Sequence, residues 1–185
     1  MTNVLLRVAV NMANTNVLKY EIEPELIRSF FKTYSHVSAL YPNPDKIVLK
    51  NIFLDMEPDL VGADSISSTL YIGEITTSGY LGGRGRDFHI GAVKKVFEAF
   101  SKFYLFTHNK NEILQRLSKY YPDLQLNNIS CHFIVPAGSA FIKSLGYRRR
   151  LFDVSIMKLD ELLLPDEIRN MMIDTLKSSR QEMSS

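Results

Sequence analysis

The chain has 185 residues, 45% of them hydrophobic and 23% charged. This composition excludes a disordered or fibrous protein and suits a single folded domain. The 22 lysines and arginines exceed the 20 acidic residues by two, which excludes a uniformly basic nucleic-acid coat, so any anion-binding surface must be local.

The first half of the chain predicts a helix followed by a strand meander. Residues 4–10 form a short apolar run that suits either a strand or a helix. Pro24 suits a first helical position, and apolar side chains then recur at spacings of three and four up to Val37. Further strands are predicted over residues 47–56, after Pro58, and over residues 69–77, with a turn at residues 65–68.

The second half predicts more helices around two further strands. Four glycines within residues 79–85 predict an irregular loop. The elements predicted after it are helices over residues 88–106, with Asp87 as N-cap, and 111–120, a strand over 129–135, a short helix over 139–145, a strand over 150–159 and a helix over 165–177. Residues 178–185 are expected to be a frayed polar tail, which leaves residues 1–177 as one domain.

This order of elements predicts an α/β fold with a central mixed β-sheet flanked by helices. A helix between two strands permits a parallel crossover, and the meander supplies antiparallel neighbours.

Two carboxylates in the meander form the first candidate site. Asp59 opens one strand and Glu74 closes the next, so a hairpin would bring them side by side. Facing carboxylates repel unless a cation lies between them, and Mg²⁺ accepts one or two carboxylates with water or phosphate as its other ligands. The alternative is that Asp59 merely begins a turn and Glu74 is an exposed strand residue.

The pattern of Pro58-Asp59, then Glu74-x-Thr76, then a Gly/Arg loop and a helix resembles the PD-(D/E)xK nuclease superfamily. The resemblance covers about residues 24–159 and implies a restriction-endonuclease-like αβββαβ core. It also implies that Asp59 and Glu74 are metal ligands and that the Ile75 carbonyl is a third. An acid on the first helix, Glu25 or Glu23, would assist.

Thr76 departs from that pattern, because the family has a lysine at this position. Superfamily members are known in which the lysine has moved to a neighbouring element, so the resemblance implies that the helix after the loop is the place for it. With Val93 at zero on a helical wheel, Lys94 lies at about 100° and borders the predicted buried face, whereas Lys95 lies at about 200° and points away. His89, at about 320°, is placed to face the site. A solvated helix face is the alternative for both lysines, and a helix-terminus histidine for His89.

Two basic clusters are candidates for phosphate contacts. Arg84 and Arg86 lie among glycines that allow peptide N–H groups to approach an anion. Lys95 would contact the phosphate backbone of the same nucleic acid. Arg148, Arg149 and Arg150 form a second cluster, for which a solvated turn is the alternative.

Together with the PD-(D/E)xK resemblance, these residues predict a Mg²⁺-dependent endonuclease acting on DNA, with Mn²⁺ able to substitute. Asp59, Glu74 and Lys94 would carry catalysis, and Glu25, Thr76 and His89 would be auxiliary. A symmetric homodimer is expected, since cutting a duplex commonly needs two active sites. Restriction and repair or junction roles both fit. One rival is a non-catalytic nucleic-acid-binding or scaffold module, which Thr76 favours, and another is a small-molecule-binding α/β domain using the Gly/Arg loop.

The single cysteine, Cys131, cannot form an internal disulfide, so a reducing, cytoplasmic location is expected. The longest apolar runs are much shorter than the ~20 residues that span a bilayer, and therefore no membrane association is predicted.

Overall fold

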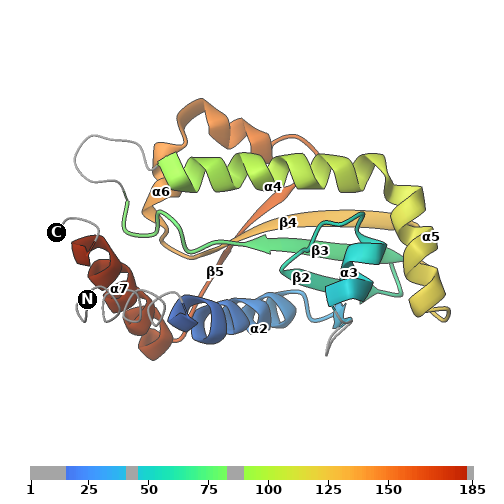
Figure 1. Cartoon of the computed structure of the whole chain (residues 1–185), viewed down its shortest axis with the longest axis horizontal. Helices are drawn as coiled ribbons and strands as arrows, with labels where there is room; N and C mark the ends of the chain where they lie inside the picture. The colour runs from blue at the N-terminus through green and yellow to red at the C-terminus, as the bar shows by residue number, and fades with distance from the viewer. Residues whose placement is uncertain (1–15, 41–45, 83–89, 183–185) are drawn as a thin grey trace, which may run out of the picture.

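The computed structural model describes residues 16–40, 46–82 and 90–182, and in these ranges it is an α/β protein built on one five-stranded mixed sheet (Figure 1). The strands lie in chain order across the sheet: β1 (Ser38–Ala39), β2 (Leu60–Asp64), β3 (Thr69–Ile75), β4 (Asn128–Pro136) and β5 (Lys158–Leu162). The β1–β2 and β2–β3 pairs are antiparallel, whereas β3–β4 and β4–β5 are parallel.

Helices cover both faces of the sheet. They are η1 (Leu18–Ile22), which is a π-helix, α2 (Glu23–Thr33), α3 (Lys46–Ile52), α4 (Ile90–His108), α5 (Lys110–Tyr120), α6 (Ala140–Ser144), η2 (Gly146–Phe152), which is a 3₁₀-helix, and α7 (Asp166–Glu182). Figure 1 shows α4 along one face and α2 along the other. Within the described residues, no helix is both long and apolar enough to cross a membrane.

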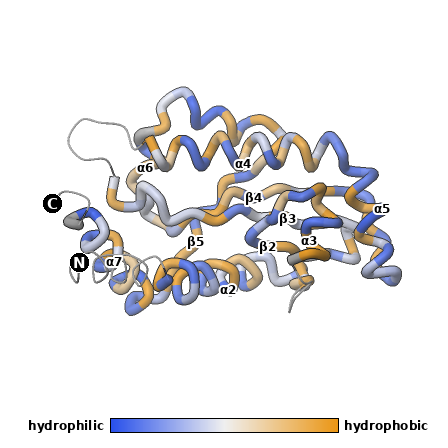
Figure 2. Tube along the Cα trace, in the orientation of Figure 1, coloured by the Kyte–Doolittle hydropathy of each residue, from blue (hydrophilic) through white to orange (hydrophobic). Residues whose placement is uncertain are grey.

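Each face of the sheet has its own hydrophobic core. Val96, Ala99 and Phe103 of α4 pack with Leu70 and Ile72 of β3 on one face, and we call this cluster the α4-side core. On the other face, α2 contributes Leu26 and Phe30 to a core with Leu60 and Tyr71. Figure 2 shows the resulting hydrophobic residues along the central strands. Because successive strand residues face opposite sides, β3 contributes to both cores.

The β2–β3 hairpin is confirmed. Its register pairs Leu60 with Gly73 and Asp64 with Thr69. In the turn, the Asp64 carboxylate accepts hydrogen bonds from the backbone N–H of Ile66, at 2.9 Å, and from the Ser67 hydroxyl. The start of β2 therefore lies beside the end of β3, as the sequence predicted.

The strand predicted over residues 47–56 is wrong, because this segment begins with α3. Leu49, Ile52 and Phe53 are buried, a spacing of three and four that belongs to a helix. The abundance of apolar residues hid this period in a short run. The short β1, which follows α2, takes the place of the missing strand beside β2.

Two other boundaries differ from the sequence prediction. The strand predicted over 150–159 begins only at Lys158, because Gly146–Phe152 forms η2. The tail is also ordered further than expected, since α7 continues to Glu182. Arg180 donates a hydrogen bond to the Gly82 carbonyl, which holds this end of α7 to the rest of the fold. The apolar run at residues 4–10, the proposed cap Asp87 and most of the Gly/Arg loop lie outside the described residues.

Candidate functional site

Asp59 and Glu74 line the same cavity, of about 350 Å³, at the end of β3. Three elements form its charged walls. Lys19 and Glu23 come from η1 and the start of α2, and Lys95, Glu98 and Lys102 come from α4. The cavity thus brings together charged side chains that are up to 83 positions apart in the chain, from Lys19 to Lys102.

The hairpin explains why the two acids meet. The backbone N–H of Asp59 donates to the Gly73 carbonyl at 2.9 Å, which continues the β2–β3 pairing by one residue. Glu74 lies two residues after the buried Ile72 and so shares its face of the sheet, the face that α4 covers. The Ile75 N–H donates to Oδ2 of Asp59 at 2.8 Å and fixes that carboxylate beside the strand.

Lys102 provides the ammonium group that Thr76 lacks. Its Nζ donates hydrogen bonds to both carboxylate oxygens of Glu74, at 2.9 and 2.8 Å. The Glu74 side chain is 15% exposed and that of Lys102 34%, so the pair is shielded from much of the solvent. An ion pair of this kind is stronger than an exposed one and fixes both groups in the cavity.

Lys94 does not lie at the cavity, and its expected position beside the buried face is wrong. Its side chain is 75% exposed, with Nζ 3.6 Å from Glu98. The buried face of α4 contains Ala92, Val96 and Ala99, and its centre lies about 100° from the direction of Val93, on the side away from Lys94. The predicted face was placed on Phe97 and Tyr104 because they are large and aromatic. Both are exposed, so that face is not the buried one.

Lys95 was expected to point away from the site, yet it lines the cavity. Its Nζ lies 3.3 Å from Glu98. The cause is the same. Because the buried face of α4 is centred on Ala92, Val96 and Ala99, Lys95 and Lys102 lie at its border. These two lysines are seven residues apart and share one side of α4.

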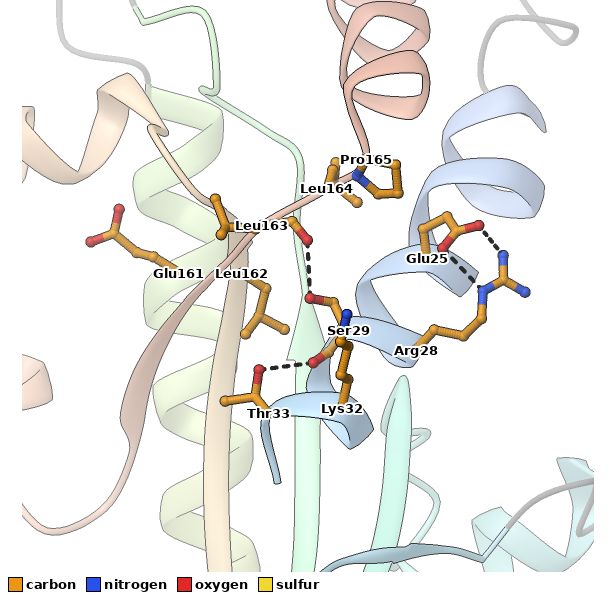
Figure 3. Close-up of a pocket in the computed structure, with 10 residues that line it drawn as sticks. All are labelled: Glu25, Arg28, Ser29, Lys32, Thr33, Glu161, Leu162, Leu163, Leu164 and Pro165. Carbon is orange, nitrogen blue, oxygen red and sulfur yellow. Dashed lines mark hydrogen bonds and ion pairs between the residues drawn. The ribbon is translucent and has the colours of Figure 1, made fainter. Parts of the chain in front are cut away.

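The first helix supplies Glu23 to the cavity, and not Glu25. Glu25 pairs with Arg28 and lines a second cavity, of about 710 Å³, between α2 and the residues after β5 (Figure 3). Ser29 donates to the Leu163 carbonyl there at 3.0 Å. The second cavity is larger, but it contains neither Asp59 nor Glu74.

Thr76 and Ile75 also line the cavity that contains Asp59 and Glu74, which we call the acidic cavity. Thr76 is buried, and its hydroxyl accepts a hydrogen bond from the Ser78 N–H at 3.1 Å, which shapes the chain as it leaves β3. His89, Arg84 and Arg86 lie outside the described residues.

The pKa values of Glu23, Asp59 and Glu74 are all raised in this cavity. Burial and the Asp59 carboxylate raise the pKa of Glu74 to about 7, although Lys102 acts in the opposite direction. The same two causes raise the pKa of Glu23 to about 7. Asp59 is partly open to solvent, but the protein around it limits its hydration and raises its pKa. A bound cation would relieve this cost.

These pKa values predict that the metal-free protein loses stability as pH rises. The Glu74 carboxyl ionises near pH 4.5 when unfolded and near 7 when folded, so its contribution is complete below pH 4.5 and is lost up to about pH 7. The expected loss is on the order of 3 kcal/mol, since each pKa unit corresponds to about 1.4 kcal/mol. Urea denaturation in EDTA at pH 5 and pH 8 should show this decline, and Glu74→Gln should make it smaller. An equal decline in both proteins would contradict the assignment.

The donor set is compatible with Mg²⁺. Asp59 and Glu74 are hard oxygen donors, and Mg²⁺ usually takes only one or two carboxylates and completes its octahedron with water and phosphate oxygens. Within the described ranges, no group of three or more His, Cys, Asp or Glu side chains is placed to hold a metal ion. The chemistry of this pair therefore suits a Mg²⁺ ion shared with substrate better than an all-protein metal cage.

A buried polar cluster on the α2 face was not predicted from the sequence. His132 is fully buried, with Nδ1 2.7 Å from Asp160 and Nε2 2.9 Å from the Ser130 hydroxyl. Tyr34 donates to the same Asp160 at 2.6 Å. The order resembles a hydrolase triad, but Ser130 lines neither of the two cavities above. The cluster joins α2 to β4 and β5.

Comparison of the chain with protein-family models, with curated proteins and with solved structures found no match. Functional assignment therefore depends on the geometry of the site.

Proposed function

We propose that this protein is a metal-dependent endonuclease that hydrolyses phosphodiester bonds of DNA. The observation that carries the proposal is the bidentate contact of Lys102 with Glu74 in the cavity that also contains Asp59. Two acids and one lysine are the set that the PD-(D/E)xK resemblance implies, with the lysine on a helix in place of Thr76. The order of elements gives partial support: with α3, between β1 and β2, and α5, between α4 and β4, set aside as insertions, it is α2, β1, β2, β3, α4, β4.

Asp59, Glu74 and the Ile75 carbonyl would hold Mg²⁺, or Mn²⁺ in its place. When bound, the ion would neutralise charge on the scissile phosphate and acidify a water molecule. Lys102 would orient that water or stabilise the charge that develops on the phosphate oxygens. The water would lose a proton as its oxygen bonds to phosphorus, the phosphorus–oxygen bond to the leaving sugar would break, and the leaving oxygen would take up a proton.

Other residues would bind the DNA. Lys95 lines the cavity, where its ammonium would contact a phosphate, and Arg84 and Arg86 remain predicted backbone contacts. We also propose a homodimer, since two active sites would cut both strands of a duplex.

A plasmid assay tests this function. Supercoiled plasmid incubated with the protein should become nicked or linear in Mg²⁺ or Mn²⁺ and should remain intact in EDTA. Folded protein that cuts under none of these conditions would favour the alternative of a non-catalytic nucleic-acid-binding or scaffold module, which the absence of lysine at Thr76 also favours.

A further inference from the structure

A strongly basic turn lies next to α6. We define the basic turn as Lys143, Tyr147, Arg148, Arg149 and Arg150, which lie at the end of α6 and in η2. It contains four of the 22 basic residues of the chain, and the remaining 18 are fewer than the 20 acidic residues. The excess of basic over acidic residues is therefore concentrated in residues 143–150.

Apolar residues within and after the basic turn anchor it to the fold. Leu145, between Lys143 and Tyr147, is fully buried, and Leu151 and Phe152, which follow the turn, pack against the α4-side core. The Phe152 ring lies 5.9 Å from that of Phe133 on β4. Gly146, with φ of +55°, makes the left-handed turn from α6 into η2. The cations thus stand on an ordered support.

The cations and an aromatic ring are presented outward. Lys143, Arg149 and Arg150 are exposed, and among the described residues no carboxylate forms an ion pair with Arg149 or Arg150. Tyr147 is 74% exposed, and the Arg148 guanidinium lies 4.6 Å from the centre of its ring. An exposed ring beside several cations is the combination that binds single-stranded nucleic acid, through base stacking and phosphate contacts.

The basic turn is connected to the acidic cavity through the loop after β3. Ser78 lines the cavity, and the next residue, Gly79, packs so closely on Ala92 and Phe141 that an added Cβ would lie within 2.8 Å of both. The Ala140 N–H then donates to the Tyr80 carbonyl at 3.0 Å. Strand β3, α4 and α6 are therefore held together at this edge of the sheet.

We infer that the basic turn binds an unpaired nucleic-acid segment, with Tyr147 stacked on a base and Arg149 and Arg150 on backbone phosphates. This inference rests on the proposed nuclease function and makes its substrate DNA that contains a single-stranded region. Paired bases within a duplex are already stacked on one another, so an exposed tyrosine gains most from an unpaired base.

Fluorescence anisotropy in EDTA tests the inference with the full chain, using a labelled single-stranded oligonucleotide and the matching duplex over a range of salt. Arg149→Gln with Arg150→Gln should weaken single-strand binding about tenfold and reduce the log–log salt slope by about 1.4, since each phosphate contact contributes about 0.7. Tyr147→Leu should weaken single-strand binding about tenfold and change duplex binding little.

The matched control removes the same charge elsewhere. Lys110→Gln with Lys119→Gln changes α5, which Figure 1 shows at the opposite end of the sheet from α6, and it should leave binding unchanged. Wild-type binding by the turn variants, or equal weakening in the control, would overturn the inference. So would a turn variant that loses binding only to phosphatidylserine vesicles.

Binding in EDTA separates this inference from the proposed function. A protein that binds through the basic turn but does not cut in Mg²⁺ would keep the inference and refute the nuclease. A protein that cuts normally while its turn variants bind as wild type does would refute the inference alone.

Discussion

Asp59→Asn and Glu74→Gln should each abolish metal-dependent cleavage of plasmid DNA. Each substitution removes one negative charge from the cavity with little change in side-chain volume, so the remaining ligands would hold Mg²⁺ poorly. We expect turnover to fall by at least on the order of 10²–10³, the loss that follows removal of one electrostatic contact to a transition state. Initial cleavage rates at saturating DNA and several Mg²⁺ concentrations would measure the effect.

Glu25→Gln is the matched control for these variants. It makes the same chemical change on α2, but Glu25 pairs with Arg28 and lines the other cavity. We expect wild-type cleavage from it. Circular dichroism should show all three variants folded, and near-wild-type cleavage by either Asp59→Asn or Glu74→Gln would refute the metal site.

The pairing of Asp59 with Glu74 could be predicted because it depends on local structure. A two-strand hairpin with a short turn leaves few registers, and the side-chain alternation then places both acids on one face. Tertiary contacts were not needed for this step. The same holds for α5, which begins one residue before its predicted start.

The lysine could not be located from the same information. Its position depends on the rotation of α4 against the sheet, and aromatic residues suggested the wrong buried face. Phe97 and Tyr104 are exposed, while the small residues Ala92 and Ala99 pack inward and allow close contact with the sheet. A pattern that gives most weight to large residues misses a buried face in which Ala92 and Ala99 lie beside Val96 and Phe103. The spacing of Lys95 and Lys102 on one helix face was the available signal.

The prediction of a strand where the structure has α3 failed for a different reason. Its seven residues are mostly apolar or β-branched, so local preference favours a strand, whereas packing of Leu49 and Ile52 in the α4-side core stabilises a helix. Tertiary packing commonly overrides propensity in segments this short.

Lys102→Met should lower turnover at saturating DNA by on the order of 10²-fold, because it removes the ammonium that faces the reacting phosphate in our proposal. The same variant should bind Mg²⁺ more tightly, by about fivefold. In the wild type, Nζ of Lys102 occupies both oxygens of Glu74 and adds a positive charge beside the metal position, so a cation must compete with it. Isothermal titration with Mg²⁺ and single-turnover cleavage would measure the two effects separately. A purely structural lysine would not produce opposite changes in metal affinity and rate.

Lys94→Met on the same helix is the control, and it should leave both quantities unchanged because its side chain is exposed outside the cavity. Thr76→Lys in the Lys102→Met background should recover part of the lost rate, since Thr76 lines the cavity beside Glu74 and a lysine there restores the family pattern. Wild-type turnover by Lys102→Met at saturating DNA and Mg²⁺ would refute the role of Lys102. Because Lys95 also lines the cavity from α4, Lys95→Met would then test whether the required ammonium lies two turns earlier on the same face.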